Sequence, residues 1–299
     1  MRPTARTADA ASCSIVRTRC DAIDDALRGG VRTRQITEIV GESGAAKTQL
    51  CAQIALFAQI DLACSCVYVH TESKAPVDVM RRLASSERFA RAFGSGELAR
   101  AALERVYVVK ALGDGEGLRA TLEGVSAVLR APIDAHAPVR VIVVDSAAAP
   151  FRDGEEDDGW SHAQRRAGTL HKMTMLLKEY ATVHDLAVIT TNHVVDVIRA
   201  GEGGGMGGRA MAAFETSGRD VVPALGLMWA NCVNTRLFLT RHDVRGRSSD
   251  RDGVGDGVKR RLHVVYAPHL RETSVEFILC QDGVRDVASD VENELAVVA

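Results

Sequence analysis

Hydrophobic and polar residues follow two patterns along this chain: short β-branched runs, and longer segments with apolar residues at helical spacing. The short runs are nearly continuous in apolar residues, as is typical of parallel strands buried on both faces. Strands are predicted at Ile36–Val40, Cys66–His70, Arg105–Val109, Val139–Asp145 and Leu186–Thr191. Helices are predicted at Gln49–Ile60, Pro76–Phe89, Gly115–Arg130 and a segment with Leu170, Met173, Leu176, Leu177 and Tyr180 on one face. Because strands and helices alternate, the fold class is α/β, with a mostly parallel central sheet flanked by helices.

The final third of the chain has a different texture, with short β-rich runs separated by turns. C-terminal antiparallel hairpin strands, extending the parallel sheet, are predicted at Thr235–Thr240, Arg261–Tyr266 and Ser274–Cys280. The charged, glycine-containing segment Arg241–Arg261 predicts an exposed loop between two of these strands. A length of 299 residues suits one large α/β domain or two small ones.

Composition and charge limit the function classes. The net charge is −2 and the pI about 6.5, so there is no global basic field, and any contact with DNA must come from local patches. The seven cysteines are scattered without a Cys-x-x-Cys pair, which favours a reduced intracellular chain over a metal site or a disulfide framework. No apolar run approaches the ~20 residues of a transmembrane helix, so no membrane partner is expected.

The first strand runs into a glycine-containing loop and then a helix, which is the order of a phosphate-binding P-loop. The loop reads Gly-Glu-Ser-Gly-Ala-Ala-Lys-Thr, and its backbone N–H groups are expected to point at an anion. Lys47 is expected to reach the β and γ phosphates, and the Thr48 hydroxyl to hold Mg²⁺. The candidate nucleotide-binding residues are Gly41, Glu42, Ser43, Gly44, Ala45, Ala46, Lys47, Thr48 and Gln49. The alternative is an ordinary glycine-rich turn before a helix.

Ala46 departs from the P-loop pattern Gly-x-x-x-x-Gly-Lys-Ser/Thr, which has its second glycine at this position. We interpret that glycine as serving left-handed backbone geometry close to the phosphates. An alanine that keeps this geometry costs about 1–2 kcal/mol. The sequence therefore predicts a P-loop with one unfavourable residue.

Polar residues follow the predicted strands at the edge where open α/β sheets build their sites. Asp145 ends a near-continuous apolar strand and is the candidate carboxylate on the Mg²⁺ side. Glu72 is a candidate to polarise water for attack on the γ phosphate, or else caps the helix that begins near Pro76. His193 is a candidate sensor of the γ phosphate, or else an ordinary solvated or hydrogen-bonded histidine. The catalytic candidates are Glu72, Lys47 and His193.

Several runs together resemble the RecA-type recombinase ATPases, specifically the eukaryotic strand-exchange recombinases and their paralogs. These runs are Asp21–Gly30, Ile36–Gln49, Val144–Arg152, Ile189–His193, Pro223–Asn231, Ala267–Leu270 and Asp282–Arg285. The resemblance implies one RecA-type P-loop ATPase domain over residues 19–288, with ATP and Mg²⁺ as cofactors. It implies that Lys47 and Thr48 bind ATP and Mg²⁺, that Asp145 supports the Mg²⁺, and that Glu72 is the catalytic glutamate.

The resemblance also implies two DNA-facing loops, at Arg152–Arg166 and Val194–Val221. The candidate DNA-binding residues are Arg152, Arg165, Arg166, Arg199 and Arg209. The first loop also carries five acids, which repel a phosphate backbone and which its arginines offset only in part.

Several residues and segments of this chain differ from the family pattern. His193 stands where strand-exchange recombinases carry a glutamine that couples nucleotide to DNA, and Ala46 replaces the P-loop glycine. We expect no N-terminal helical DNA-binding domain of the family, because the chain starts close to its P-loop, and no Phe-x-x-Ala tether. Residues 1–18 are expected to form a disordered arm and residues 289–299 a tail.

Three functional hypotheses follow from these observations. The first is an accessory recombinase paralog with weak, DNA-dependent ATP turnover, which acts in homologous-recombination repair. Its implied partners are another recombinase paralog subunit and single-stranded or branched DNA, in the nucleus, while the Arg-bearing start leaves an organelle pool open. The second is an autonomous DNA-dependent ATPase that exchanges strands. The third is a nucleotide-free interaction scaffold.

Overall fold

The computed structural model describes residues 13–72, 74–130, 137–152, 159–197, 213–243 and 258–287, and of residues 130, 159–162 and 243 only the backbone. The helices are α1 Asp21–Ala26, α2 Lys47–Leu62, α3 Val77–Ala84, α4 Glu87–Phe93, α5 Gly96–Ala101, α6 Gly115–Arg130, α7 Gly159–Val183 and α8 Gly226–Ala230, with 3₁₀ turns η1 Ala102–Arg105 and η2 Ala149–Phe151. The strands are β1 Ile15–Val16, β2 Val31–Arg32, β3 Gln35–Gly41, β4 Ser65–His70, β5 Val106–Lys110, β6 Val139–Asp145, β7 Ala187–Asn192, β8 Val194–Asp196, β9 Phe214–Thr216, β10 Arg219–Pro223, β11 Thr235–Asp243, β12 Val258–Tyr266, β13 Thr273–Cys280 and β14 Gly283–Asp286.

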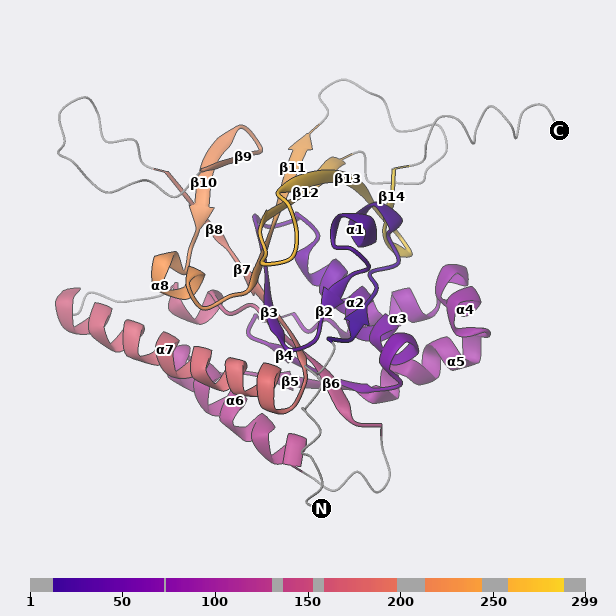
Figure 1. Cartoon of the computed structure of the whole chain (residues 1–299), viewed down its shortest axis with the longest axis horizontal. Helices are drawn as coiled ribbons and strands as arrows, with labels where there is room; N and C mark the ends of the chain where they lie inside the picture. The colour runs from indigo at the N-terminus through magenta and orange to yellow at the C-terminus, as the bar shows by residue number, and fades with distance from the viewer. Residues whose placement is uncertain are drawn as a thin grey trace, which may run out of the picture.

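A nine-stranded sheet in the order β14-β13-β12-β11-β3-β7-β6-β4-β5 forms the centre of the molecule (Figure 1). The strands from β11 to β5 are parallel to their neighbours, whereas β12, β13 and β14 continue from β11 as antiparallel strands. The predicted fold class, a mostly parallel sheet with C-terminal antiparallel hairpins, is confirmed. β3 lies in the interior of the sheet, between β7 and β11, so the loop that follows Gly41 leaves from the carboxyl edge of the parallel strands.

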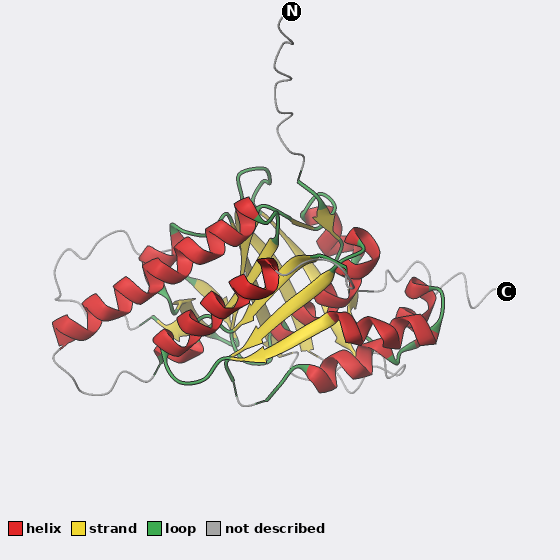
Figure 2. Cartoon of the chain, turned by 90° about the horizontal axis from the view of Figure 1, so that it is seen from below, coloured by secondary structure: helices red, strands yellow, loops and turns green. Residues whose placement is uncertain are grey.

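Helices cover both faces of the sheet and create two hydrophobic cores (Figure 2). Side chains alternate between the faces of a strand. In β3, Ile39 therefore joins the core under α2, while Ile36 joins the core under α6 and α7. The first core also takes in α1 and α3 to α5, and within it the rings of Phe57 and Phe89 stack with centroids 4.3 Å apart. α2 is buried from Leu50 to Gln59, which explains why this stretch is apolar except at Gln53 and Gln59.

The two predicted DNA-facing loops contain regular structure, since α7 begins within Arg152–Arg166 and β8, β9 and most of β10 lie within Val194–Val221. Three further features differ from the sequence predictions. The helix predicted over Pro76–Phe89 is two helices, because Ser86 ends one turn and caps the next: its hydroxyl donates to Leu83 O (2.7 Å) and accepts from Phe89 N (3.4 Å). The predicted exposed loop Arg241–Arg261 is shorter at both ends, because β11 extends to Asp243 and β12 begins at Val258.

The third difference is at the N-terminus. Residues 13–18, assigned above to a disordered arm, contain β1, which pairs antiparallel with β2. Asp24 fixes this segment by accepting hydrogen bonds from the backbone of Thr18 (2.7 Å) and Arg19 (3.0 Å). Residues 1–12 and the expected tail 289–299 lie outside the described residues. None of the helices within the described ranges combines the length and the hydropathy that a membrane crossing requires.

Candidate nucleotide-binding site

The loop between β3 and α2 has the sharp turn of a P-loop. Gly44 has φ +79°, and Ala46 has φ 79° and ψ 17°, so both adopt left-handed backbone geometry. The prediction that position 46 needs left-handed geometry is confirmed, and Ala46 keeps it with its methyl group buried. Left-handed geometry costs a non-glycine residue about 1–2 kcal/mol, so this turn stores strain next to the first residue of α2.

Lys47 begins α2 and turns back toward the loop. Its Nζ donates to the carbonyl oxygens of Gly41 (2.7 Å) and Glu42 (2.9 Å), and the residue is 8% exposed. Burial lowers the pKa of Lys47 to about 8, although the carboxylates of Asp145 and Glu72 act to raise it. Among the described residues, the ammonium at the mouth of the loop has hydrogen-bond contact with these neutral carbonyls alone, and an anion would stabilise its charged form.

Asp145 ends β6 beside the start of α2 and accepts three hydrogen bonds from hydroxyl groups. Thr48 Oγ1 (2.8 Å) and Tyr68 OH (2.7 Å) donate to Oδ2, and Thr191 Oγ1 (2.6 Å) donates to Oδ1. The structure thus brings the two candidate metal residues, Thr48 and Asp145, together. Sequence reasoning missed Tyr68 and Thr191. Both could have been found in the sequence, because each carries a hydroxyl group near the carboxyl end of a strand, β4 or β7, that lies next to β6.

The chemistry of this group suits a hard divalent cation. Carboxylate and hydroxyl oxygens are the donors that Mg²⁺ prefers. Asp145 forms no ion pair with a basic side chain among the described residues; its hydrogen-bond donors there are neutral hydroxyls, and Lys47 interacts with it at longer range. The residues present therefore fit a magnesium-type ion held by Asp145 and Thr48.

Glu72 and His193 meet across the carboxyl edge of the sheet. Their nearest atoms, Glu72 Oε1 and His193 Nε2, are 3.1 Å apart, but they are not aligned as a hydrogen bond. Burial, together with Lys47 and Arg152, lowers the pKa of His193 to about 4, so the imidazole is neutral at physiological pH. The contact is therefore not an ion pair. Glu72 is 55% exposed and its backbone is held by His70, whose Nδ1 lies 3.1 Å from Glu72 O.

The remaining P-loop candidates divide into two groups. Ser43 and Gly44 are exposed at the tip of the loop, whereas Gly41 and Ala45 are buried beneath it. Gly41 tolerates no side chain, because an added Cβ would lie 2.7 Å from Leu239 O. Gln49 faces away from the loop, and its Oε1 accepts a hydrogen bond from Arg82 (2.8 Å).

Glu42 turns away from the phosphate side and contacts the β9–β10 hairpin. Its carboxylate accepts from Ser217 Oγ (2.5 Å), Thr216 Oγ1 (2.7 Å) and Arg219 (3.0 Å), and Arg241 is 3.9 Å away. Burial acts to raise the pKa of Glu42, but these donors hold it below its ordinary value. The P-loop is thereby joined to a hairpin at the end of the second candidate DNA loop, Val194–Val221, a contact that the sequence did not predict.

A second buried carboxylate, Glu38, organises the same edge from within the sheet. It is fully buried and accepts hydrogen bonds from Asn192 Nδ2 (2.7 Å), Trp229 Nε1 (2.8 Å) and Arg236 Nε (2.5 Å). Arg236 also lies over the ring of Tyr266, 5.3 Å from its centroid. Glu38 thus fixes Asn192, the residue before His193, and joins β3, β7, α8 and β11.

The candidate DNA-binding arginines are only partly described. Arg152, which directly follows η2, and Arg165, on α7, are exposed. Arg166 is half-buried, donates to Ala224 O (3.3 Å) and lies over the Phe151 ring at 5.8 Å, so it supports packing. Arg199 and Arg209 lie outside the described residues, as do the acids of the first loop.

Comparison with known proteins agrees with this geometry. The Rad51 family model matches residues 11–287, which is nearly the whole chain. The chain belongs to the Rad51 family. Among curated members, it is similar to the DNA repair protein XRCC3 homolog of Arabidopsis thaliana, at 33% identity over 89% of this chain and 91% of that protein. It is also similar to the DNA repair protein XRCC3 of Bos taurus, at 30% identity over 89% and 73% of the two chains.

A third relative, the DNA repair protein rhp57 of Schizosaccharomyces pombe, is 26% identical over 88% of this chain and 76% of that protein. The resemblance to recombinase paralogs drawn from the sequence runs is therefore confirmed, and it is to the XRCC3-like members of the Rad51 family. Membership in the Rad51 family implies nucleotide binding with a divalent metal, which agrees with the grouping of Lys47, Thr48 and Asp145.

Proposed function

We propose that this chain is an accessory Rad51-family paralog that binds ATP and Mg²⁺ and acts in homologous-recombination repair in the nucleus. Its partners in this proposal are another recombinase paralog subunit and single-stranded or branched DNA. The observation that carries the proposal is the convergence of Lys47, Thr48 and Asp145 at one end of β3 and β6. Three relatives named as DNA repair proteins, which the chain matches over most of their length, support the repair role.

Each site residue has a role in nucleotide binding that follows from its position. Lys47 would exchange its two carbonyl acceptors for phosphate oxygens, since an anion offers its ammonium a stronger partner. Thr48 and Asp145 would hold Mg²⁺, which neutralises charge on the phosphates when it is bound. The backbone N–H groups at the start of α2 add the positive end of a helix.

Hydrolysis is proposed to be weak. Glu72 is the candidate for orienting the attacking water, yet it is half-exposed and lies against a neutral histidine. Bulk water surrounds an exposed carboxylate, which therefore orients one particular attacking water less well than a buried carboxylate does. Ala46 adds strain at the point where the loop approaches the phosphates. We therefore expect binding to be retained and turnover to be slow.

A titration of ATP into the purified chain with Mg²⁺ tests the nucleotide proposal. We expect saturable binding that requires Mg²⁺ and is lost in Lys47→Ala, while Lys74→Ala, a charge-matched change outside the P-loop, binds as the wild type does. Absence of saturable, Mg²⁺-dependent binding would overturn the proposal.

A nucleotide-free scaffold is the second candidate, and one observation favours it. Lys47 and Thr48 both have partners within the protein, in the carbonyls of Gly41 and Glu42 and in Asp145. A scaffold predicts that Lys47→Ala leaves capture of partner subunits from cell extract unchanged. The proposed ATP-binding role predicts that capture weakens in this variant and depends on added ATP.

Electron microscopy of the chain with ATP and single-stranded DNA separates the accessory role from an autonomous recombinase. We expect no regular filaments from the chain alone. Regular filaments would favour strand exchange by this chain without a partner.

A further inference from the structure

Two arginines lie behind the P-loop, where β11 ends and β12 begins. Alternate residues of a strand share a face, so Arg260 lies on the face of β12 that carries Leu262 and Val264, two residues of the first core. On β11, Arg241 lies on the same face as Leu239 of that core, and it pairs directly with Arg260 across the two strands. An apolar row on each strand therefore ends in a basic residue at the carboxyl edge of the sheet.

The guanidinium of Arg260 holds one carbonyl group of the P-loop. Nε and Nη2 both donate to the carbonyl oxygen of Gly44, each at 3.2 Å, while Nη1 donates to Val258 O at 3.2 Å. Arg260 is 4% exposed. Because a guanidinium is a rigid planar fork, these bonds hold the side chain and the Gly44 carbonyl in one relative orientation.

The peptide group that carries this carbonyl has its N–H on the other side of the loop. A trans peptide is planar, so the Gly44 carbonyl and the Ala45 N–H point in opposite directions. The Ala45 N–H donates to Glu42 O (3.3 Å), and Lys47 Nζ donates to the same oxygen (2.9 Å). The Ala45 N–H thus points to the side of the loop where the ammonium lies, and where the phosphates of the proposed nucleotide would lie.

Gly44 gives this peptide group little orientation of its own. Its φ is +79°, and glycine populates positive and negative φ about equally, so the peptide after it turns over at low cost. A side chain at this position would also meet the second arginine, because an added Cβ would lie 2.8 Å from Arg241 Nη1. The glycine therefore leaves room for the arginines behind the loop, and Arg260 supplies the orientation that the glycine lacks.

We propose that Arg260 is a positioning residue for the P-loop, which directs the Ala45 N–H at the phosphates of a bound nucleotide by holding the Gly44 carbonyl. This role rests on the proposed nucleotide binding and adds to it a residue 216 positions away from Gly44 in the sequence. The backbone N–H groups of a P-loop cradle the α and β phosphates, which ADP and ATP share. Arg260 therefore contributes equally to the binding of both nucleotides.

Calorimetric titration of the full chain with ADP and with ATP, each with Mg²⁺, tests this role. In Arg260→Gln we expect Kd to rise about tenfold or more, by the same factor for both nucleotides, with an unchanged number of sites per chain. The reason is that a loop in the binding orientation only a tenth of the time binds tenfold less tightly.

Two further variants serve as controls. Arg261→Gln makes the same charge change at the next residue, on the other face of β12, in a solvent-accessible ion pair with Glu276, and should leave Kd unchanged. Arg260→Lys should keep Kd within about threefold of the wild type, because an ammonium also donates a charge-assisted hydrogen bond to a carbonyl.

The number of sites per chain separates positioning from support of the fold. A residue that only supports the fold lowers the fraction of chains that bind and leaves the Kd of the remainder unchanged. That result in Arg260→Gln, or a Kd equal to that of Arg261→Gln, would mean that Arg260 does not position the loop.

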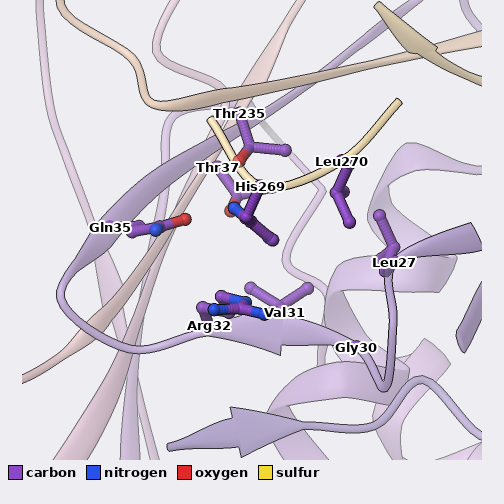
Figure 3. Close-up of a pocket in the computed structure, with 9 residues that line it drawn as sticks. All are labelled: Leu27, Gly30, Val31, Arg32, Gln35, Thr37, Thr235, His269 and Leu270. Atoms are coloured by element: carbon purple, nitrogen blue, oxygen red, sulfur yellow. The ribbon is translucent and has the colours of Figure 1, made fainter. Parts of the chain in front are cut away.

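NMR of the wild type tests the role even if Arg260→Gln folds poorly. With ADP and Mg²⁺ the Ala45 amide signal should shift, while the Arg260 Nε–H should stay protected from exchange with solvent because it remains on Gly44 O. The His269 ring is an internal reference near the start of β3: the cavity that it lines has a volume of about 10 Å³, room for about one water, so its signals should not shift (Figure 3). Loss of Arg260 protection, or an unshifted Ala45 amide, would contradict the role.

The wild type also separates this role from the proposed function. If it shows no saturable binding of either nucleotide, the proposed function is wrong, and the role of Arg260 is wrong with it. If the wild type binds and Arg260→Gln binds equally well, only the role of Arg260 is wrong.

Discussion

At the scale of single residues, Ala46 combines an unfavourable residue type with a required backbone conformation. Its left-handed φ of 79° is the geometry that glycine would adopt without cost. The neighbouring Ala45 is not among the residues with positive φ, so the strain is confined to one position of the loop. This makes the two alanines a matched pair for measuring what the strain does.

We expect Ala46→Gly to stabilise the fold by about 1 kcal/mol, because relief of left-handed strain exceeds the added flexibility of the unfolded chain. ATP turnover should rise as well, since a misplacement of about 1 Å costs on the order of 100-fold in rate. Denaturant unfolding and steady-state hydrolysis measure the two effects. Ala45→Gly, the control, should destabilise the fold, and an unchanged turnover in Ala46→Gly would contradict this account of Ala46.

Lys47 predicts a pH dependence of nucleotide binding. Its pKa is lowered from 10.5 to about 8, so between these values the unfolded chain binds more protons than the folded chain, and stability rises with pH. In the same window Lys47 loses its charge. Bound phosphates favour the charged form and should return the proton.

We therefore expect ATP binding to take up protons at about pH 9 and not at about pH 7, where Lys47 is already charged. Titration calorimetry in two buffers of different ionisation enthalpy measures the uptake. The variant Lys47→Arg stays charged throughout and should show none. Equal uptake in this variant would assign the proton to another group.

At the scale of elements, the sequence predicted a helix or strand correctly where a single hydrophobic pattern determines the element. The buried parallel strands were predicted within a residue or two, because a short β-branched run this continuous in apolar residues is typical of a strand between two helix layers. The meeting of Thr48 and Asp145 was also predictable, since strand ends of a parallel sheet share one edge. The strands β8, β9 and β10 were missed because they are only three to five residues long, and because β8 pairs with β10 across more than 20 residues.

The hydrogen-bond partners of Glu42 could not be predicted from the P-loop sequence. A glutamate within a P-loop pattern suggests a role toward the nucleotide, yet its partners Thr216, Ser217 and Arg219 are more than 170 residues away. No local pattern carries a pairing at that distance. The structure instead assigns Glu42 to hold the β9–β10 hairpin against the loop.

We expect Glu42→Gln to speed amide hydrogen exchange in β9 and β10, because the neutral amide loses its charge-assisted bond to Arg219. Glu215→Gln, an exposed change on β9, should leave exchange unchanged and serves as the control. Since the pKa of Glu42 is held below its ordinary value, its contribution is complete above the ordinary carboxyl pKa and is lost as the pH falls through the lowered one. Equal protection of the hairpin in both variants would contradict a role for Glu42 as its anchor.

At the scale of the whole molecule, one buried ion pair holds the centre of the sheet. Glu38 and Arg236 are 0% and 4% exposed and join β3 to β11. Replacing one member of such a pair leaves the other charge buried without compensation, which typically costs 3–5 kcal/mol. The cost should affect the entire fold, because β3 lies between both cores.

We expect Glu38→Gln to lower the free energy of unfolding by about 3–5 kcal/mol in denaturant titrations. Glu276→Gln removes the same charge from an exposed pair with Arg261 and should change stability by less than about 1 kcal/mol. The double variant Glu38→Gln with Arg236→Met should recover part of the loss. Similar losses in Glu38→Gln and Glu276→Gln would mean that burial does not set the strength of this pair.

The position of β3 between β7 and β11 also sets the order in which the protein can assemble during synthesis. Gln35 pairs with Ala187, and Thr37 pairs with Thr235, so the ribosome must add some two-thirds of the chain before β3 has both neighbours. At about 5–20 residues per second, that delay is on the order of 10–40 s. Throughout it, the apolar edge that carries the P-loop is exposed on a nascent chain. The nucleotide-binding loop, although encoded early, is thus among the last parts of the molecule to acquire its final surroundings.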